Sequence, residues 1–174
     1  MATREIDTNV LGSDVSFTLS GPWSAYWLFF LRVMTGWWML HAGLTKLLEG
    51  SFQAGGYLEF ATAGTVVGPV TTWFGANAVW LPNMLIPIGE FMIGLGLIVG
   101  CLTRLASFFG AFLMVFFYFG NSDWAHGMVS GDMMGMLLFM TVGVLGAGRV
   151  LGLDQYLEKT NFVKNNRWLR YLLG

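Results

Sequence analysis

Four apolar stretches dominate the pattern of hydrophobic and polar positions along the chain. They cover about residues 24–48, 79–102, 105–120 and 133–150, and charged side chains are sparse within them. A bilayer core of about 30 Å needs roughly 20 apolar helical residues to cross it. The pattern therefore predicts four transmembrane helices. Because the turn that ends at Arg104 is short, the second and third helices are expected to form an antiparallel hairpin.

Polar and small residues fall on one face of each predicted helix. Arg32 and Lys46 share a narrow stripe on the first helix, whereas His41 points the opposite way. On the second helix, Glu90 shares a stripe with Gly94. Each helix thus has one small or polar face and one wide apolar face, which is typical of helices packed against each other in a bilayer. We therefore expect an all-α fold, an integral membrane four-helix bundle.

The segments outside the bundle differ in composition. Residues 1–23 are polar and form a separate N-terminal segment without a basic region that leads into a short apolar run, so the first span is expected to be an uncleaved anchor. Residues 49–78 are mostly apolar and rich in glycine, which predicts short helices in the outer interface, over the helix ends. Residues 151–174 interleave basic and aromatic side chains, which predicts a C-terminal amphipathic helix on anionic lipid.

Composition narrows the class of protein. Apolar residues make up 55% of the 174-residue chain and charged residues only 11%, with a mean hydropathy of +0.62. Soluble domains are nearer 25% charged. A soluble enzyme, a nucleic-acid binder and a disordered chain are therefore not expected. Cys101 is the single cysteine, which excludes an internal disulfide and a cysteine-rich metal site.

Basic residues concentrate on one side of the predicted membrane domain. Arg104 lies in the turn between the second and third spans, and the loops on the other side hold mainly acidic residues. Five further basic residues lie at the end of the fourth span and in the tail: Arg149, Lys159, Lys164, Arg167 and Arg170. Since basic loops remain in the cytoplasm, we expect a multi-pass protein of the cytoplasmic membrane with both termini cytoplasmic.

Depth along the predicted helices indicates which charges should pair. A rise of 1.5 Å per residue puts Glu90 near the midplane and Arg32 about 6 Å toward the cytoplasm. Because a charge near the centre costs at least about 2.5 kcal/mol, Arg32 and Glu90 are expected to face the interior and form an ion pair. Lys46 and Asp132 both lie at the outer end, where they could form a second pair.

Four stretches carry a resemblance to a known family. They are RVMTGWWMLHAGLTK (32–46), PIGEFMIGLG (87–96), GCLTRLA (100–106) and the Gly131–Asp132 pair before the last span. Together they resemble the DoxX family over about residues 24–153. The resemblance implies a four-helix membrane protein linked to quinone or to thiosulfate oxidation, and some relatives work with thiols. With Cys101 alone, a disulfide relay within the chain is not expected.

The candidate site lies in the outer half of the bundle, beneath residues 49–78. Glu90 and His41 are the catalytic candidates, because a carboxyl group and an imidazole in such a position can transfer protons. The residues expected to bind a quinone are Arg32, Lys46, Tyr118, Asp132 and Trp38. Polar groups that converge under an apolar cover are typical of a ligand pocket.

Simpler interpretations of the same residues stay open. The intramembrane charges could form a purely structural ion pair, and His41 could face lipid or the core. Residues 49–78 could cap a solid interior, and His126 fits a solvated loop. No haem, metal or nucleotide site is expected, since the two histidines and the carboxylates lie at different depths and no glycine-rich phosphate loop is present.

Two functions of different classes fit this pattern. The first is a DoxX-type subunit that binds a lipid quinone, takes electrons from a partner subunit or from a small reductant such as thiosulfate, and contributes to respiratory or sulfur-compound oxidoreductase chemistry. The second is a non-catalytic accessory subunit that stabilises a larger membrane complex. Both predict contact with the lipid bilayer and with a partner subunit or a second copy, and neither involves nucleic acid. A small-molecule channel is a third possibility, which a central ion pair would block.

Overall fold

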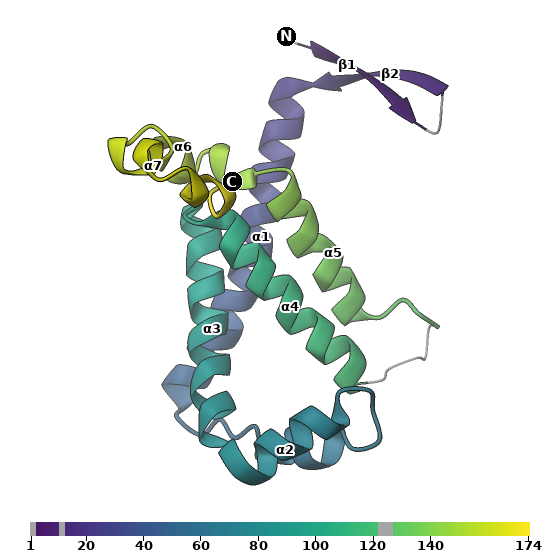
Figure 1. Cartoon of the computed structure of the whole chain (residues 1–174), viewed down its shortest axis with the longest axis vertical. Coiled ribbons are helices and arrows are strands. Elements are labelled where there is room, and N and C mark those ends of the chain that lie inside the picture. Colours follow the sequence, from purple (N-terminus) through teal and green to yellow (C-terminus); the bar gives the residue numbers. More distant parts are fainter. Residues whose placement is uncertain (1–2, 11–12, 122–126) are drawn as a thin grey trace.

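Four long helices form the body of the protein. The computed structural model describes residues 3–10, 13–121 and 127–174, and the long helices are α1 (Gly21–Glu49), α3 (Trp80–Val99), α4 (Thr103–Asn121) and α5 (Gly131–Val144). They pack as two pairs, α1 on α3 and α4 on α5, and a tight turn joins α3 to α4 (Figure 1). By length and composition, α3 and α4 can cross a membrane, and α5 is a shorter apolar helix.

Close main-chain contacts hold α1 against α3. A Cβ atom added at Gly36 would lie 2.9 Å from Cβ of Leu97, and one added at Gly43 would lie 2.9 Å from the carbonyl carbon of Glu90. Gly94 of α3 lies in the same way against the main chain of Leu40. Small residues let two helix backbones approach closely. These glycines therefore determine which residues of the two antiparallel helices lie opposite each other.

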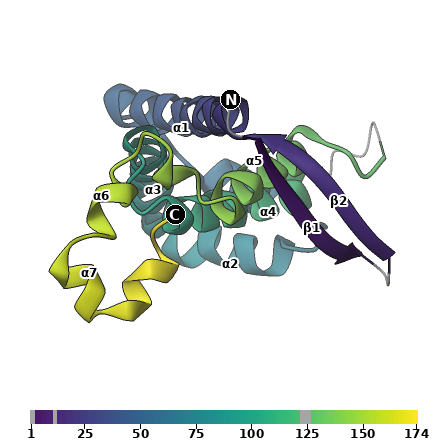
Figure 2. The same ribbon diagram turned by 90° about the horizontal axis from the view of Figure 1, so that it is seen from above.

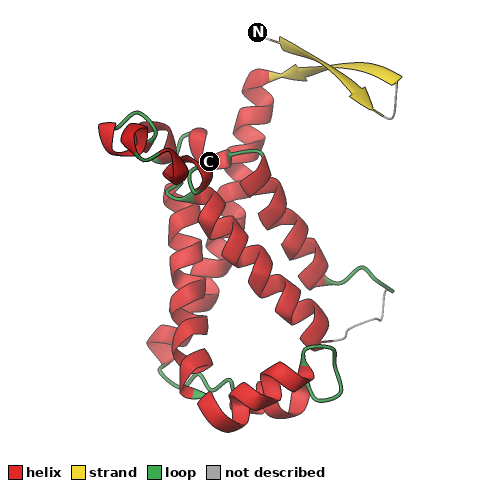
Figure 3. Ribbon diagram, in the orientation of Figure 1, coloured by secondary structure: helices red, strands yellow, loops and turns green. Residues whose placement is uncertain are grey.

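The N-terminal segment is a β-hairpin, which the sequence analysis did not predict. Strand β1 (Thr3–Val10) pairs antiparallel with β2 (Ser13–Ser20), and the hairpin projects from the start of α1 (Figure 3). The signal for β2 is present in the sequence, because Val15, Phe17 and Leu19 alternate with serine and threonine. Such alternation is typical of a strand. The helical remainder agrees with the expected all-α class.

The segment between α1 and α3 forms short helices across one end of the four long helices. It contains a π-helical turn, η1 (Tyr57–Ala61), and helix α2 (Gly68–Ala78), which lies across the ends of the long helices (Figure 1). A buried hydrogen bond of 2.5 Å between the hydroxyl groups of Thr62 and Thr71 joins the two elements. We call this end of the molecule the α2 end. The short helices that the sequence predicted over the helix ends are therefore present.

The last 25 residues, 150–174, form a folded tail at the opposite end, which we call the tail end. Instead of the expected single amphipathic helix, the tail has two short helices, α6 (Asp154–Leu157) and α7 (Asn161–Asn165), and a 3-10 turn, η3 (Arg167–Tyr171) (Figure 2). Thr160 begins α7 as its N-cap, accepting a bond from Val163 N at 3.4 Å. That prediction is therefore wrong, because local caps divide the segment. The fourth helix also ends at Val144 rather than near residue 150, since Gly146 adopts a left-handed conformation (φ 63°).

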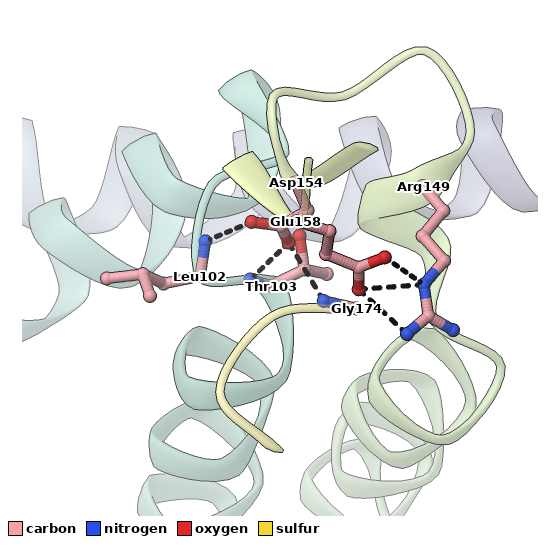
Figure 4. Close-up of polar contacts among 6 residues, drawn as sticks. All are labelled: Leu102, Thr103, Arg149, Asp154, Glu158 and Gly174. Carbon is pink, nitrogen blue, oxygen red and sulfur yellow. Dashed lines mark hydrogen bonds and ion pairs between the residues drawn. The ribbon is translucent and has the colours of Figure 1, made fainter. Parts of the chain in front are cut away.

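A buried carboxylate attaches the tail to α4. The side chain of Asp154 accepts hydrogen bonds from the main-chain N–H groups of Leu102 (2.8 Å) and Thr103 (2.9 Å) (Figure 4). It also accepts one from Gly174 N at 3.1 Å. A carboxylate at a helix N-terminus satisfies exposed N–H groups and interacts favourably with the helix dipole. Asp154 thus joins the start of α4 to both ends of the tail.

Candidate functional site

A polar cavity of about 350 Å³ lies at the α2 end, between the long helices and the start of the covering segment. Its polar lining comes from five parts of the chain: Lys46, Gln53, Tyr57, Glu90, Asn121 and Asp132. Phe52, Ile86 and Phe117 contribute apolar walls. Three of the predicted site residues, Lys46, Glu90 and Asp132, therefore meet around one cavity, in the region where the sequence placed the site.

The strongest polar contact in the cavity is an ion pair between α1 and α3. Lys46 Nζ lies 2.5 Å from Glu90 Oε2, and the ring of Phe52 lies 5.6 Å from the same ammonium group. The side chain of Glu90 is only 3% exposed, whereas that of Lys46 is 27% exposed. Gly43 makes this pair possible, since it brings the α3 backbone close one turn before Lys46. The carboxylate is thus held inside, and the lysine reaches it from the wetter side.

Both predicted ion pairs are wrong. Glu90 pairs with Lys46 rather than Arg32, and Asp132 accepts a hydrogen bond from Asn121 rather than pairing with Lys46. The reason is the register of α1 on α3, which places Arg32 beside Gly100, ten residues and about 15 Å along the helix from Glu90. The rise per residue along each helix does not determine which residues of α1 lie opposite which residues of α3.

Arg32 instead holds the chain that follows α5. Its guanidinium group is fully buried and donates to the main-chain carbonyls of Ala147 (2.7 Å), Val150 (2.9 Å) and Leu151 (3.2 Å). A guanidinium group presents several donors in a fixed plane, which suits a turn with several free carbonyls. Arg32 therefore lies at the tail end, away from the polar cavity, and its hydrogen bonds stabilise the turn that follows α5.

A second polar cluster forms the other wall of the cavity. Tyr57 Oη donates to Asn121 Oδ1 at 2.8 Å, and Asn121 Nδ2 donates to Asp132 Oδ2 at 2.8 Å. Gly120 leaves room for the phenol, since an added Cβ would lie 2.6 Å from Tyr57 Oη. Burial raises the pKa of Tyr57, and the negative charge of Asp132 raises it further. The cluster connects η1, α4 and α5 by neutral donors to one carboxylate.

The remaining predicted site residues lie outside the polar cavity. His41 is exposed on another face of α1, with its ring 6.2 Å from that of Trp37. Trp38 is exposed and stacks on Phe139 at 6.4 Å, and Tyr118 donates a hydrogen bond to Met128 O at 3.0 Å. His126 lies outside the described residues. Within the described part of the chain, no three His, Cys, Asp or Glu side chains gather in a way that could hold a metal.

The sequence analysis missed three polar residues of the cavity region. Tyr57 and Gln53 come from the covering segment, and Asn121 ends α4. Asn83 fixes the covering segment in place, since its Oδ1 accepts from Ala54 N (2.7 Å) and its Nδ2 donates to Gln53 Oε1 (3.0 Å). The sequence signal that could have indicated these residues is the presence of isolated amide and phenol side chains among apolar ones.

An apolar pocket adjoins the polar cavity. It has a volume of about 270 Å³ and shares Tyr57, Ile86 and Phe117 with the polar cavity as common wall residues. Its other walls, from α2, α3 and α4, are almost entirely apolar and include Phe74, Leu85 and Phe116. The two spaces together offer a polar compartment lined by one cation, amides and carboxylates, and an apolar compartment beside it.

Comparison with protein families agrees with this arrangement. The DoxX family model matches residues 27–121, more than half of the chain. The chain belongs to the DoxX family. The match includes most of the DoxX chain's polar cavity, from Lys46 to Asn121, while Asp132 and the tail lie beyond it. DoxX proteins are membrane-associated, in keeping with the two membrane-capable helices. No curated protein and no solved structure matches the chain.

Proposed function

We propose that this DoxX protein is a multi-pass subunit of the cytoplasmic membrane that binds a lipid quinone. In this proposal the quinone head group lies in the polar cavity and the start of its isoprenoid tail lies in the apolar pocket. The observation that carries the proposal is the shared wall between these two spaces. A ligand with a small polar head and a long apolar tail matches that combination.

Exposed apolar side chains support membrane integration. Along α4, Phe108, Phe109 and Phe112 are each about half exposed or more, and α1 and α3 carry similar rows. Exposed apolar surface costs about 25 cal/mol per Å² in water, and monomeric soluble proteins rarely carry apolar patches this extensive. Four helices with such surfaces fit four spans, with α1, α3, α4 and α5 as the spanning elements. The basic tail end then lies in the cytoplasm.

The chemistry of the polar cavity suits both redox states of a quinone. Quinone carbonyls accept hydrogen bonds, and the ammonium group of Lys46 has N–H bonds besides the one that it directs to Glu90. Quinol hydroxyls donate hydrogen bonds, and the carboxylates of Glu90 and Asp132 can accept them. Reduction of a quinone takes two electrons and two protons. In this proposal Glu90 and Asp132 exchange the protons, and a partner subunit or a small reductant such as thiosulfate supplies the electrons.

Binding of a short-chain quinone to the full-length protein in lipid nanodiscs tests the proposal. We expect Glu90→Gln to weaken binding of decylubiquinol, the reduced form of a short-chain quinone, about tenfold, since a quinol hydroxyl donates to the carboxylate and a hydrogen bond to a charged group contributes about 1.5–3 kcal/mol. Glu49→Gln is the matched control, because Glu49 is an exposed glutamate at the end of α1. Folding of both variants is checked by thermal unfolding.

The result also separates the two classes of function. A wild-type protein that binds no quinone, or a Glu90→Gln variant that binds as tightly as wild type, contradicts the proposal. The alternative is then a non-catalytic accessory subunit whose wide apolar faces contact a larger complex. Copurification of a stoichiometric partner from membranes, together with an absence of quinone binding, would support that alternative.

A further inference from the structure

A second cavity lies between α4 and α5, toward the tail end. Its volume is about 350 Å³, and its walls are apolar along most of their length, with Phe108, Ala111, Phe139 and Val144 among them. Ser107 and Arg104 lie at the end nearest the tail. We call this space the α4/α5 groove. It shares no lining residue with the polar cavity or with the apolar pocket.

The basic end of the groove carries the guanidinium group of Arg104. Among the described residues, the ion pairs within 4 Å do not include Arg104. Its Nη2 lies 3.7 Å, and Arg149 Nη1 lies 3.4 Å, from the position of a Cβ at Gly146, so two arginines converge there. Arg149 is paired with Glu158 at 2.8 Å (Figure 4), which leaves the charge of Arg104 available.

Basic side chains outnumber acidic groups at this end of the molecule. The negative charges there are those of Asp154 and Glu158, together with the carboxyl group of Gly174, whose carbon lies 3.3 Å from the same point beside Gly146. The tail adds four basic side chains at this end of the molecule: Lys159, Lys164, Arg167 and Arg170. An anion that approaches the groove therefore meets a net positive field.

A buried hydroxyl group inside the groove has no partner. Ser107 is 3% exposed, and its Oγ makes no hydrogen bond within the described structure. It lies opposite Gly143 of α5, where an added Cβ would be 2.9 Å from Ser107 Cβ. Buried hydroxyl groups almost always have a partner, so an unpaired one in a cavity wall indicates a ligand with an acceptor atom.

We propose that the α4/α5 groove binds an anionic glycerophospholipid. Its phosphate pairs with Arg104, an ester carbonyl accepts the hydrogen bond of Ser107, and one acyl chain lies along the apolar walls toward Ala111. The groove from Arg104 to Ala111 spans about 10 Å of helix, and basic pockets between spanning helices suit acidic lipid head groups. The proposal shares the membrane integration of the proposed function but is independent of quinone binding.

Retention of lipid by the purified full-length protein tests this site. The protein in detergent is offered equimolar phosphatidylglycerol and phosphatidylcholine of the same acyl composition, and bound lipid is counted by native mass spectrometry. We expect wild type to retain phosphatidylglycerol several-fold over phosphatidylcholine. Arg104→Gln should lose most of that preference, and Arg170→Gln, which removes an exposed tail charge that does not line the groove, should keep it.

A variant that blocks the groove tests binding along its apolar walls separately from the charge of Arg104. Ala111→Trp fills the apolar wall while leaving Arg104 in place, and we expect it to lower retention of both lipids. Equal losses in Arg104→Gln and Arg170→Gln would overturn the proposal, since they would indicate diffuse attraction to the basic tail. Displacement of phosphatidylglycerol by millimolar inorganic phosphate alone would also overturn it, because the site would then bind a free anion.

Two controls keep the outcome distinct from that of quinone binding. Arg104→Gln should bind decylubiquinone as wild type does, because Arg104 is remote from the polar cavity. Loss of lipid preference with quinone binding intact therefore supports the groove, and absence of any lipid preference in wild type overturns it whatever the quinone result. If a thermal melt shows that Arg104→Gln is unfolded, Ala111→Trp decides the question by its phosphatidylglycerol retention.

Discussion

Gly43 of α1 lies directly against the main chain of Glu90 of α3, and this contact sets the position of the buried ion pair. An added Cβ at Gly43 would lie 2.8 Å from Pro87 O and 2.9 Å from the carbonyl carbon of Glu90. The two helices could not keep their separation with any larger residue there. Lys46, one turn further along α1, then reaches the Glu90 carboxylate at 2.5 Å.

Gly43→Ala should therefore be strongly destabilising. Forcing a side chain into a well-packed contact costs about 1–3 kcal/mol, and the backbone atoms around Gly43 cannot move as a flexible side chain would. The measurement is the free energy of unfolding in detergent. Gly89→Ala is the matched control, because an added Cβ at Gly89 meets nothing within 4 Å. Equal stabilities of the two variants would contradict the contact.

The two partners of the ion pair should differ in their effect on stability. Lys46→Met leaves the buried carboxylate of Glu90 without a counter-ion, whereas Glu90→Gln leaves a lysine that is 27% exposed and can reach water. We expect Lys46→Met to cost more, up to about 3–5 kcal/mol. The double variant Lys46→Met/Glu90→Leu should recover part of that loss. A double-mutant cycle measures the coupling, and a cycle without coupling would refute the pair.

Arg32→Met should loosen the tail end without changing the polar cavity. The substitution removes the donor to the main-chain carbonyls of residues 150 and 151 and one of the two donors to Ala147 O. A buried group that loses its partner costs about 1–3 kcal/mol. We expect faster trypsin cleavage at Arg149 or Lys159 and unchanged binding of decylubiquinone. Arg167→Met is the comparison, and cleavage at the same rate in both variants would count against the contact.

Stability at alkaline pH should report the ionisation of Tyr57, whose phenol is partly buried. Its pKa is raised in the folded protein by burial and by Asp132, so the unfolded chain loses this proton first as pH rises. The neutral phenol therefore contributes stability below its unfolded pKa of about 10, and the contribution declines as pH rises toward the folded pKa. Tyr57→Phe should lose stability less steeply than wild type above about pH 10. Parallel pH profiles would contradict this.

Membrane topology can be tested with single cysteines in a Cys101→Ser background. Met128→Cys lies in the loop before α5, where Met128 is exposed. We expect an impermeant maleimide to label it from outside intact cells, because the basic tail end should remain in the cytoplasm. Asn166→Cys, in the tail, should react only after permeabilisation. The reverse labelling pattern would invert the proposed orientation.

The location of the polar cavity was predictable, but its pairing was not. Hydropathy and helical rise placed Lys46 and Asp132 at one end of the long helices and Glu90 near their middle, and the structure gathers all three around the cavity at the α2 end. The partners depend on which residues of α1 and α3 lie opposite each other, and glycine contacts at Gly43 and Gly94 decide that. A register of this kind depends on main-chain packing between helices, which no single-helix pattern contains.

The positions of Tyr57 and of Asp154 in the tail could not be predicted from the sequence pattern either. Tyr57 belongs to a covering segment whose path depends on hydrogen bonds to Asn83 and Asn121, far away in the chain. Asp154 resembles any surface acid in the sequence, yet it is fully buried at the start of α4. Both positions result from tertiary contacts that override local composition.

The bonds of Arg32 constrain the order in which the protein can be assembled. Arg32 lies in the first long helix to leave the ribosome, and its acceptors lie 115 to 119 residues later. Until those residues are synthesised, the guanidinium group lacks all three of its carbonyl acceptors, and burying an unpaired charge is costly. The first long helix can therefore take its final position only after the turn beyond α5 has been made. Completion of the chain, rather than formation of any one helix, is then the step that commits the protein to its native packing.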